Sequence, residues 1–448
     1  MEYKMKNVVI SLGFVILSVL LCGCQNQRSV KRSKNAFNFA KFIFEKPPTL
    51  NVFIRSIDIN TGKVILRGND NRKPSAPFTI KWGDGTTTEG LFPQEHTYSD
   101  RTKNYIVTIK ANYPDSSFYS TEAFVRFIAP QMKTIPAGNK TPVTIPDIKI
   151  ELGSRLPLEG MYKFSESLSF FTDDFFTLYP RKTIENILSV AAQVQMDLVN
   201  DDVFMKDNRF DQVLLRDADF GGMYSLWYTN PVSFGVGDYG LQGAVQWSSF
   251  FHEMGHNFTL NTPADYYFGG KTDGNANAIY SETMAQIFQH VTAYEMINNY
   301  KKYGLSEDLA YELRISANAS FFWTVTAYNR YISSGMNFKT WNDPNSSHDE
   351  TSGAFMSLAY KFFEHAELEK VDYCKALKRM MKFLQRFDED WHRRYEPDKD
   401  TVEGESFRAT MMVAALSYAF DKDLKQEFKN LNFPVNDAIY SELMVCKN

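Results

Sequence analysis

Apolar and polar residues alternate along five short segments between residues 49 and 128. The segments read NVFIRSIDI, GKVILRG, FTIKWGDG, YIVTIKANY and AFVRFIA. A period of two places successive side chains on opposite faces of a strand, and turn residues separate the segments. Short strands at this spacing predict a β-sandwich over residues 48–129.

Helical spacing replaces the alternation farther along the chain. In TIENILSVAAQVQMDLV, residues 183–199, apolar side chains recur every three or four positions and predict a helix. The following FDQVLLRD is typical of a buried strand, and from residue 244 onward the segments are mostly helical. We therefore expect an α+β subdomain over residues 130–300 and a mostly helical subdomain over residues 301–448.

The composition is that of a folded protein without a strong charge bias. Of the 448 residues, 44% are hydrophobic and 15% aromatic, which is enough for well-packed cores. The formal net charge is −4, and no cluster of lysine and arginine is interleaved with aromatic residues. We therefore expect no nucleic acid among the partners of this protein.

The first residues have the features of a bacterial export signal. Lysines precede an apolar run from Asn7 to Leu21, which has the length of a secretory signal core and is short for a membrane span. The run leads into LCGC, where small residues before a cysteine resemble a bacterial lipobox. The resemblance implies a lipoprotein signal peptide over residues 1–24, with Cys24 as the first mature residue carrying palmitate, and a tether over residues 25–47. We therefore expect an exported protein, anchored through its lipid to a membrane of the bacterial cell envelope.

Two further cysteines lie far along the chain. Cys374 and Cys446 would remain in an oxidising compartment after export. Their spacing leaves open whether they form a disulfide bond, because sequence cannot bring them together.

The segment His252-Glu253-Met254-Gly255-His256 is the strongest chemical signal in the sequence. Residues four apart lie on one face of a helix, so both imidazoles can bind one metal ion, for which zinc is the usual choice. The glutamate between them can take a proton from a water molecule held by that ion. With this chain's content of histidine and glutamate, the pattern arises by chance in about one such chain in 200. The spacing therefore predicts a catalytic zinc site with Glu253 as general base.

The third metal ligand decides the class of zinc enzyme. A metzincin requires glycine and histidine where this chain has Thr259 and Thr262, so that class is excluded. The two candidates that remain are Glu282, in YSETMA, and Asp265, in TPADYYFGG. We favour Glu282, because Ala285 stands one turn later and its small side chain would allow two helices to approach closely.

HEMGHN, followed about 25 residues later by SETMA, resembles the gluzincin peptidases, and HEMGHN is similar to the motif of their enhancin-type, mucin-directed branch. The C-terminal ALSYAFDKDL and FPV segments are similar to the end of that branch. The resemblance covers residues 180–448 and implies a zincin fold with one zinc ion (Zn²⁺) per chain, bound by His252, His256 and Glu282. Some gluzincins carry a supporting carboxylate one turn after the third ligand, where this chain has Gln286.

The segment Trp82-Gly83-Asp84-Gly85, followed by HTY and YIVTIKA, resembles the PKD-type immunoglobulin-like module. The resemblance implies that the β-sandwich is a spacer or a binding domain. We interpret Asp84 as a residue of a tight turn rather than a calcium or ligand site. His96, in the HTY segment, is interpreted as a hydrogen-bonding residue at a strand edge rather than a metal ligand.

A peptidase also needs a group that stabilises the oxyanion of the tetrahedral intermediate. Gluzincins use a tyrosine or histidine downstream of the glutamate ligand, and His348 lies at a similar distance here. The alternatives are an exposed loop position for His348 and a donor role for Tyr266, Tyr280 or Tyr360.

The glycine-rich segment SFGVG precedes the HExxH motif. Phe234, Gly235 and Gly237 would belong to an edge strand that pairs with the backbone of an extended substrate. The alternative is a plain turn between strand and helix.

Three functions are compatible with these patterns. The first is a zinc metallopeptidase that hydrolyses extracellular proteins or glycoproteins, and the second is a zinc aminopeptidase of the same clan. An aminopeptidase needs an acidic group for the substrate amine, commonly in GxMEN, and GVGDYG offers only Asp238. The third is a non-catalytic, glycan- or protein-binding surface lipoprotein, which would have no need to keep Glu253. The oligomeric state stays open.

Overall fold

The computed structural model describes residues 50–70, 77–130, 147–150, 177–199, 212–218, 223–225, 232–235, 247–256, 278–339, 348–384 and 402–445. The chain divides into two units, Met1–Ala36 and Phe37–Asn448, and everything described belongs to the second. Cys24, the predicted signal peptide and tether, Asp265 and Cys446 lie outside the described residues. None of the helices formed by these residues combines the length and the apolar character that crossing a membrane requires.

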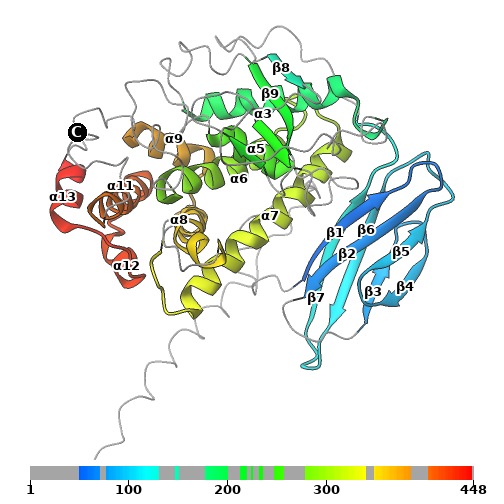
Figure 1. Cartoon of the computed structure of the whole chain (residues 1–448), viewed down its shortest axis with the longest axis horizontal. Helices are drawn as coiled ribbons and strands as arrows, with labels where there is room; N and C mark the ends of the chain where they lie inside the picture. The colour runs from blue at the N-terminus through cyan, green and yellow to red at the C-terminus, as the bar shows by residue number, and fades with distance from the viewer. Residues whose placement is uncertain are drawn as a thin grey trace, which may run out of the picture. The chain divides into compact units, whose positions relative to one another are not determined.

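Residues 50–130 form two antiparallel sheets, which we call the β region (Figure 1). One sheet has the order β1-β2-β5, and the other has the order β4-β3-β6-β7. The strands are β1 (Leu50–Ile57), β2 (Lys63–Asp70), β3 (Phe78–Lys81), β4 (Thr87–Gly90), β5 (Gln94–Thr97), β6 (Tyr105–Asn112) and β7 (Phe118–Val125). Buried side chains from both sheets, such as Ile54 and Leu66 from the first and Ile80 and Val107 from the second, form one hydrophobic core. The period-two alternation therefore predicted the β content of this region correctly.

Two strands of the β region carry little of the apolar signal. β4 and β5 have the sequences TTEG and QEHT, and their side chains are half-buried or exposed. Strands of this kind are held by the ladders that they form, β4 with β3 and β5 with β2, rather than by apolar burial. The sequence patterns did not predict them.

The WGDG turn is held by hydrogen bonds within the β region. The Oδ1 atom of Asp84 accepts hydrogen bonds from the backbone N–H of Thr86 at 2.9 Å and from its hydroxyl at 2.6 Å. The other carboxylate oxygen, Oδ2, lies 2.7 Å from Nε2 of His96, whose ring stacks on Trp82. Burial acts to raise the pKa of Asp84, but the bonds from Thr86 and His96 outweigh it and lower the pKa to about 2. The interpretation of Asp84 as a turn residue and of His96 as a hydrogen-bonding strand residue is confirmed, and the structure adds that the two bond to each other.

A small mixed sheet follows in the chain, with the strand order β10-β11-β9-β8. Its strands are β8 (Asp147–Ile150), β9 (Gln212–Ala218), β10 (Met223–Ser225) and β11 (Val232–Gly235). β11 pairs in parallel with β9 and antiparallel with β10, so its backbone is hydrogen-bonded on both sides. The prediction that Phe234 and Gly235 lie on an edge strand is therefore wrong, because β10 takes the place expected for the substrate; Gly237 lies outside the described residues.

The rest of the described chain is helical. The elements are α3 (Arg181–Val199), α5 (Trp247–Gly255), η3 (Ala278–Glu282), α6 (Thr283–Asn298), α7 (Glu307–Ser333), α8 (His348–Leu368), α9 (Tyr373–Leu384), α11 (Val402–Phe420), α12 (Lys425–Asn430) and α13 (Asp437–Val445). α6 is buried on nearly all sides and packs against α3, α5, α7, α8 and α9 (Figure 1). One hydrophobic core extends from Leu178 to Leu443, so the subdomain boundary expected at residue 300 falls within it.

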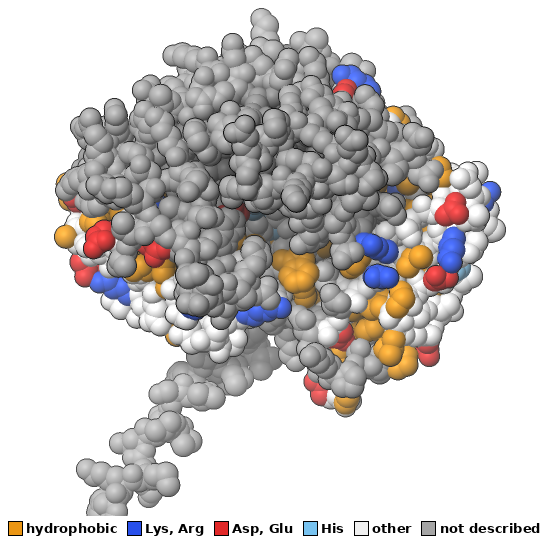
Figure 2. All heavy atoms as spheres, in the orientation of Figure 1, with side chains coloured by type: hydrophobic (Ala, Val, Ile, Leu, Met, Phe, Trp, Pro, Cys, Tyr) orange, Lys and Arg blue, Asp and Glu red, His pale blue; other side chains and the backbone are white. Residues whose placement is uncertain are grey.

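Charged side chains of both signs occur among the described residues on the face drawn in Figure 2. On the face drawn in Figure 2, acidic and basic side chains of the described residues are interspersed rather than separated into regions of one sign. Lys63 and Glu95, for example, form an exposed ion pair of 2.8 Å across β2 and β5. Cys374 is half-buried and is not in a disulfide bond, and its thiol donates to Glu295 Oε2 at 3.7 Å.

Candidate metal centre

The HExxH motif lies on α5, as the spacing predicts. Helix α5 buries Trp247, Phe250, Phe251 and Met254, which makes the opposite face available for the two histidines. The buried side chain of Gln195, on α3, donates to the backbone oxygen of Phe251 at 2.8 Å. This bond ties α5 to α3. The motif is therefore part of the hydrophobic core rather than a pair of surface histidines.

His252 and His256 lie side by side, the first within α5 and the second directly after its last residue. Their ring centroids are 4.9 Å apart, with the planes at 86°. Glu282, which ends η3, reaches both rings. Its Oε2 lies 3.1 Å from His252 Nε2, and its Oε1 lies 3.5 Å from His256 Nε2. Ligand atoms around a tetrahedral zinc ion, each about 2.0 Å from it, are about 3.3 Å apart, so the distance from Glu282 to each histidine is close to the one between two such ligands.

Close packing of α5 on α6 brings Glu282 to the histidines. A β-carbon added at Gly255 would lie 3.0 Å from Cβ of Phe288 and 3.3 Å from Cα of Ala285. Any residue with a β-carbon at this position would push its neighbours away by a few tenths of an ångström. The small residue expected one turn after Glu282 is thus at the contact, and the glycine within the motif faces it.

The segment that carries Glu282 also supports His256. The turn η3 is π-helical, and such turns are frequent at functional sites. Ser281, the residue before Glu282, is buried and its hydroxyl lies 2.9 Å from Nδ1 of His256. With Nδ1 donating to Ser281, the nitrogen that faces Glu282 is the unprotonated one, which is the form that binds a metal.

Gln286, one turn after Glu282, supports the other histidine. Burial acts to lower the pKa of His252, Glu282 and Glu253 raise it, and a hydrogen bond with Gln286 adds a smaller contribution to the rise. The amide nitrogen of Gln286 lies 2.9 Å from the hydroxyl of Thr324 and 3.0 Å from Nε2 of His290. An amide anchored to α7 therefore stands where some gluzincins have a carboxylate. The sequence shows that Gln286 replaces this carboxylate, but it did not predict that Gln286 contacts His252. The position of Gln286 one turn after Glu282 was the signal that could have indicated this contact.

Burial and nearby charge act differently on the two histidines. Burial lowers the pKa of His256 to about 4, and the charge of Glu282 opposes this only in part. For His252, burial also acts downward, but the hydrogen bond and charge of Glu282 outweigh it and raise the pKa. His256 is thus neutral at pH 7, which is the form of imidazole that binds a metal ion.

Glu253 lies beside the ligand set. It is buried, and its Oε2 is 4.0 Å from His256 Nε2. His252, Glu253 and His256 form a group whose ligand atoms all lie within 4.8 Å of one another. A carboxylate at this distance can accept a proton from a water molecule held between the imidazoles and Glu282.

A second group of possible ligands, Glu364, His365 and Glu427, lies between α8 and α12. The ammonium of Lys361 contacts Glu364 at 2.5 Å and Glu427 at 2.8 Å. His365 Nε2 lies 3.0 Å from the same Glu427. A lysine already neutralises these carboxylates, so the group is an ion-pair cluster and not a place for a metal.

The structure tests the candidate oxyanion donors only in part. His348 is the first residue of α8, and its side chain is outside what the structure describes, as is Tyr266. Tyr280 lies on η3 and is buried, and burial raises its pKa. Tyr360 stacks on Tyr328 with ring centroids 4.1 Å apart. The oxyanion role of His348 stays a prediction.

No family model, no curated protein and no solved structure matches this chain.

Proposed function

We propose that this protein is a zinc-dependent peptidase of the gluzincin type. The observation that carries the proposal is the position of Glu282, whose two carboxylate oxygens lie 3.1 and 3.5 Å from the imidazole nitrogens of His252 and His256. Two nitrogen donors and one oxygen donor are a set that catalytic zinc uses, with the fourth position left for water. Bound zinc would supply a Lewis acid and a water molecule whose pKa is lowered to about 7.

The residues around this position would then share the steps of peptide hydrolysis. Glu253 takes the proton from the attacking water and passes it to the leaving amine. His348, at the start of α8, is the proposed donor to the oxyanion. Ser281 and Gln286 hold the two imidazoles in the orientation that binding requires.

Strand β10 is the proposed substrate strand in place of β11. Among the described strands it is the last of its sheet, it runs antiparallel to β11, and it packs against α5. An extended peptide that adds to the outer edge of β10 would therefore lie next to the helix that carries the histidines. This backbone pairing favours cleavage within a chain over removal of its first residue.

The proposal also covers the fold of both parts of the chain and the location of the protein. We assign the β region to the PKD-type immunoglobulin-like sandwiches and the helical part to the zincin fold, on the resemblance of their motifs. The lipobox-like LCGC supports a location in the bacterial cell envelope, with a lipid on Cys24. The substrates would then be extracellular proteins or glycoproteins.

Metal analysis and peptide cleavage for the wild type and Glu253→Gln test the proposal. The wild type should contain one zinc ion per chain and cleave peptides of a library, and a chelator should abolish cleavage. Glu253→Gln should keep the zinc and lose about 10²–10⁴-fold in kcat, because the amide cannot accept the proton. Glu364→Gln, a carboxylate of the ion-pair cluster, is the matched control and should cleave at the wild-type rate.

Peptides with acetylated N-termini separate the two kinds of peptidase. An endopeptidase cleaves them, whereas an aminopeptidase requires a free amine. A wild type without bound zinc, or a Glu253→Gln variant that cleaves normally, would refute the proposed mechanism. A zinc-loaded wild type that cleaves no peptide, casein or mucin would favour the binding protein.

A further inference from the structure

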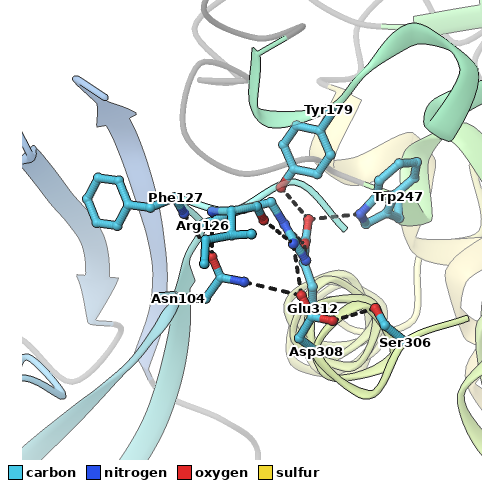
Figure 3. A network of polar contacts seen from close by, with 9 residues as sticks. Asn104, Arg126, Phe127, Tyr179, Trp247, Ser306, Asp308 and Glu312 are labelled. Carbon is cyan, nitrogen blue, oxygen red and sulfur yellow. Dashed lines mark hydrogen bonds and ion pairs between the residues drawn. The ribbon is translucent and has the colours of Figure 1, made fainter. Parts of the chain in front are cut away.

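Strand β7 of the β region docks on helix α7 through alternate residues of one face. Glu122 accepts a hydrogen bond from the hydroxyl of Tyr311, and the rings of Phe124 and Tyr311 lie 6.1 Å apart. The next residue of this alternation, Arg126, follows directly after the strand and points at α7 (Figure 3). The β region therefore contacts the helical part along a continuous stripe, which a spacer on a flexible connection would not need.

Arg126 is the buried centre of this contact. Its side chain is only 1% exposed. Its Nε donates to Glu312 Oε2 at 2.7 Å, and its Nη1 donates to Asp308 Oδ2 at 2.9 Å. Burial acts to lower the pKa of Arg126, but the charge of Glu312 outweighs it and raises the pKa, so the guanidinium stays charged. A buried charge of this kind requires its partner, because removing one member of the pair leaves the other uncompensated.

Glu312 connects Arg126 to the metal-binding helix. Its second carboxylate oxygen, Oε1, accepts hydrogen bonds from Nε1 of Trp247 at 3.0 Å and from the hydroxyl of Tyr179 at 2.5 Å (Figure 3). Trp247 is fully buried and is the first residue of α5. One carboxylate thus binds the β region with one oxygen and the start of α5 with the other.

A second bond fixes the same end of α5. The backbone N–H of Ser248 donates to the hydroxyl of Ser316 at 3.1 Å. This bond satisfies one of the amides at a helix start that have no partner within their own helix. Asp308, Glu312 and Ser316 recur every four residues along α7, so one face of α7 contacts both the β region and α5.

We infer that the β region holds the metal-binding helix in place, with Arg126 and Glu312 as the positioning residues. His252 lies on α5 beyond its anchored first turn and His256 directly follows the helix, so a shift of that turn moves both histidines. The metal part of this inference rests on the proposed function, whereas the coupling of β7 to α5 does not. The β region is then an integral part of the site rather than a spacer.

Hydrogen–deuterium exchange on the metal-free, full-length mature protein tests the coupling without any assumption about zinc. In Arg126→Met, amides of residues 247–256 should exchange at least about tenfold faster than in the wild type, because Glu312 loses its charge partner. Adding Glu312→Gln should restore much of the protection, since the amide oxygen can still accept from Trp247 without a buried charge. Arg101→Met is the matched control and should leave α5 unchanged, because Arg101 is bonded to the backbone of Asn60 within the β region.

Zinc binding supplies a second readout that a purely structural contact would not change. Coupling between two sites is reciprocal, so zinc should slow exchange in residues 118–126 of the wild type but not of Glu312→Gln. Faster exchange confined to residues 118–126 in Arg126→Met, with α5 unaffected, would overturn the inference. If the wild type binds no zinc but Arg126→Met still loosens α5, the coupling holds and the proposed function fails. Should Arg126→Met not fold, Arg126→Lys keeps the charge without the forked geometry and serves the same comparison.

Discussion

Replacing Gly255 with alanine would test the contact that brings Glu282, the proposed third ligand, to the histidines. The new β-carbon would lie 3.0 Å from Cβ of Phe288 and 3.3 Å from Cα of Ala285. Carbon atoms pack best at about 3.5–4.0 Å, so α5 and α6 must separate by about 0.5 Å. Neither neighbouring atom is the end of a flexible side chain, and Phe288 is fully buried. The backbones themselves therefore have to move.

The expected magnitudes follow from this geometry. Alanine gains at most about 1 kcal/mol over glycine in a helix, whereas overpacking of a core costs about 1–3 kcal/mol. We expect a net loss of about 0–2 kcal/mol in the free energy of unfolding. The distances from Glu282 to the two histidines, now 3.1 and 3.5 Å, would change by more than the tolerance of about 0.2 Å at a metal site. Zinc affinity should therefore fall at least about tenfold.

Two measurements on the same protein check this prediction. Competition with a chelating dye gives the Kd for zinc, and urea unfolding of the metal-free protein gives the stability. Gly353→Ala, on α8, is the control. Its added β-carbon would lie 3.1 Å from the ring of Tyr331 on α7, a similarly tight contact. This variant should leave zinc affinity unchanged. A Gly255→Ala variant that is more stable and binds zinc as tightly as the wild type would refute the close helix contact.

Two further predictions concern polar groups. Gln286→Leu should lower zinc affinity about 10- to 100-fold, because His252 loses a hydrogen-bond partner, and Gln286→Glu should bring the affinity back to the wild-type value. Equal Kd values for zinc in the wild type and both variants would contradict a supporting role of Gln286. Hydrogen bonding with His365 lowers the pKa of Glu427 to about 2 from 4.5; burial opposes the shift and Lys361 adds to it. Because the folded-state pKa is depressed, the stabilisation is complete above about pH 4.5 and is lost as the pH falls through about 2. After allowance for screening of a side chain that is 32% exposed, Glu427→Gln should lose about 1–2 kcal/mol in urea unfolding at pH 7 and less at pH 3, whereas an equal loss at both would refute the ion pair.

The local patterns carry much of the secondary structure. Alternation predicted β1, β2, β3 and β6, whose inward side chains such as Val107 and Ile109 are fully buried. Helical spacing predicted α3 within two residues of its start at Arg181. The polar strand β5 was not predicted, because its stability comes from pairing with β2 and its own residues do not indicate that partner.

The candidate site divides in the same way. The motif on α5 and the preference for Glu282 came from sequence, because the four-residue spacing within one helix is local and Ala285 stands one turn after Glu282. The supporting contacts of Ser281 and Gln286 required the structure, since each depends on how η3 and α6 pack on α5. The interior position of β11 was misjudged because strand order is a property of the sheet and not of the strand.

The sequence by itself determined most of the apolar strands and helices and the residue types of the candidate site, because both are encoded by residues a few positions apart. Only the tertiary structure decided which elements meet. Arg126 and Glu312 are 186 residues apart, and no sequence motif contains both. Their pairing arises because β7 and α7 pack together and a buried guanidinium needs a carboxylate beside it. The same packing brings the β region to the first turn of the helix that carries the histidines.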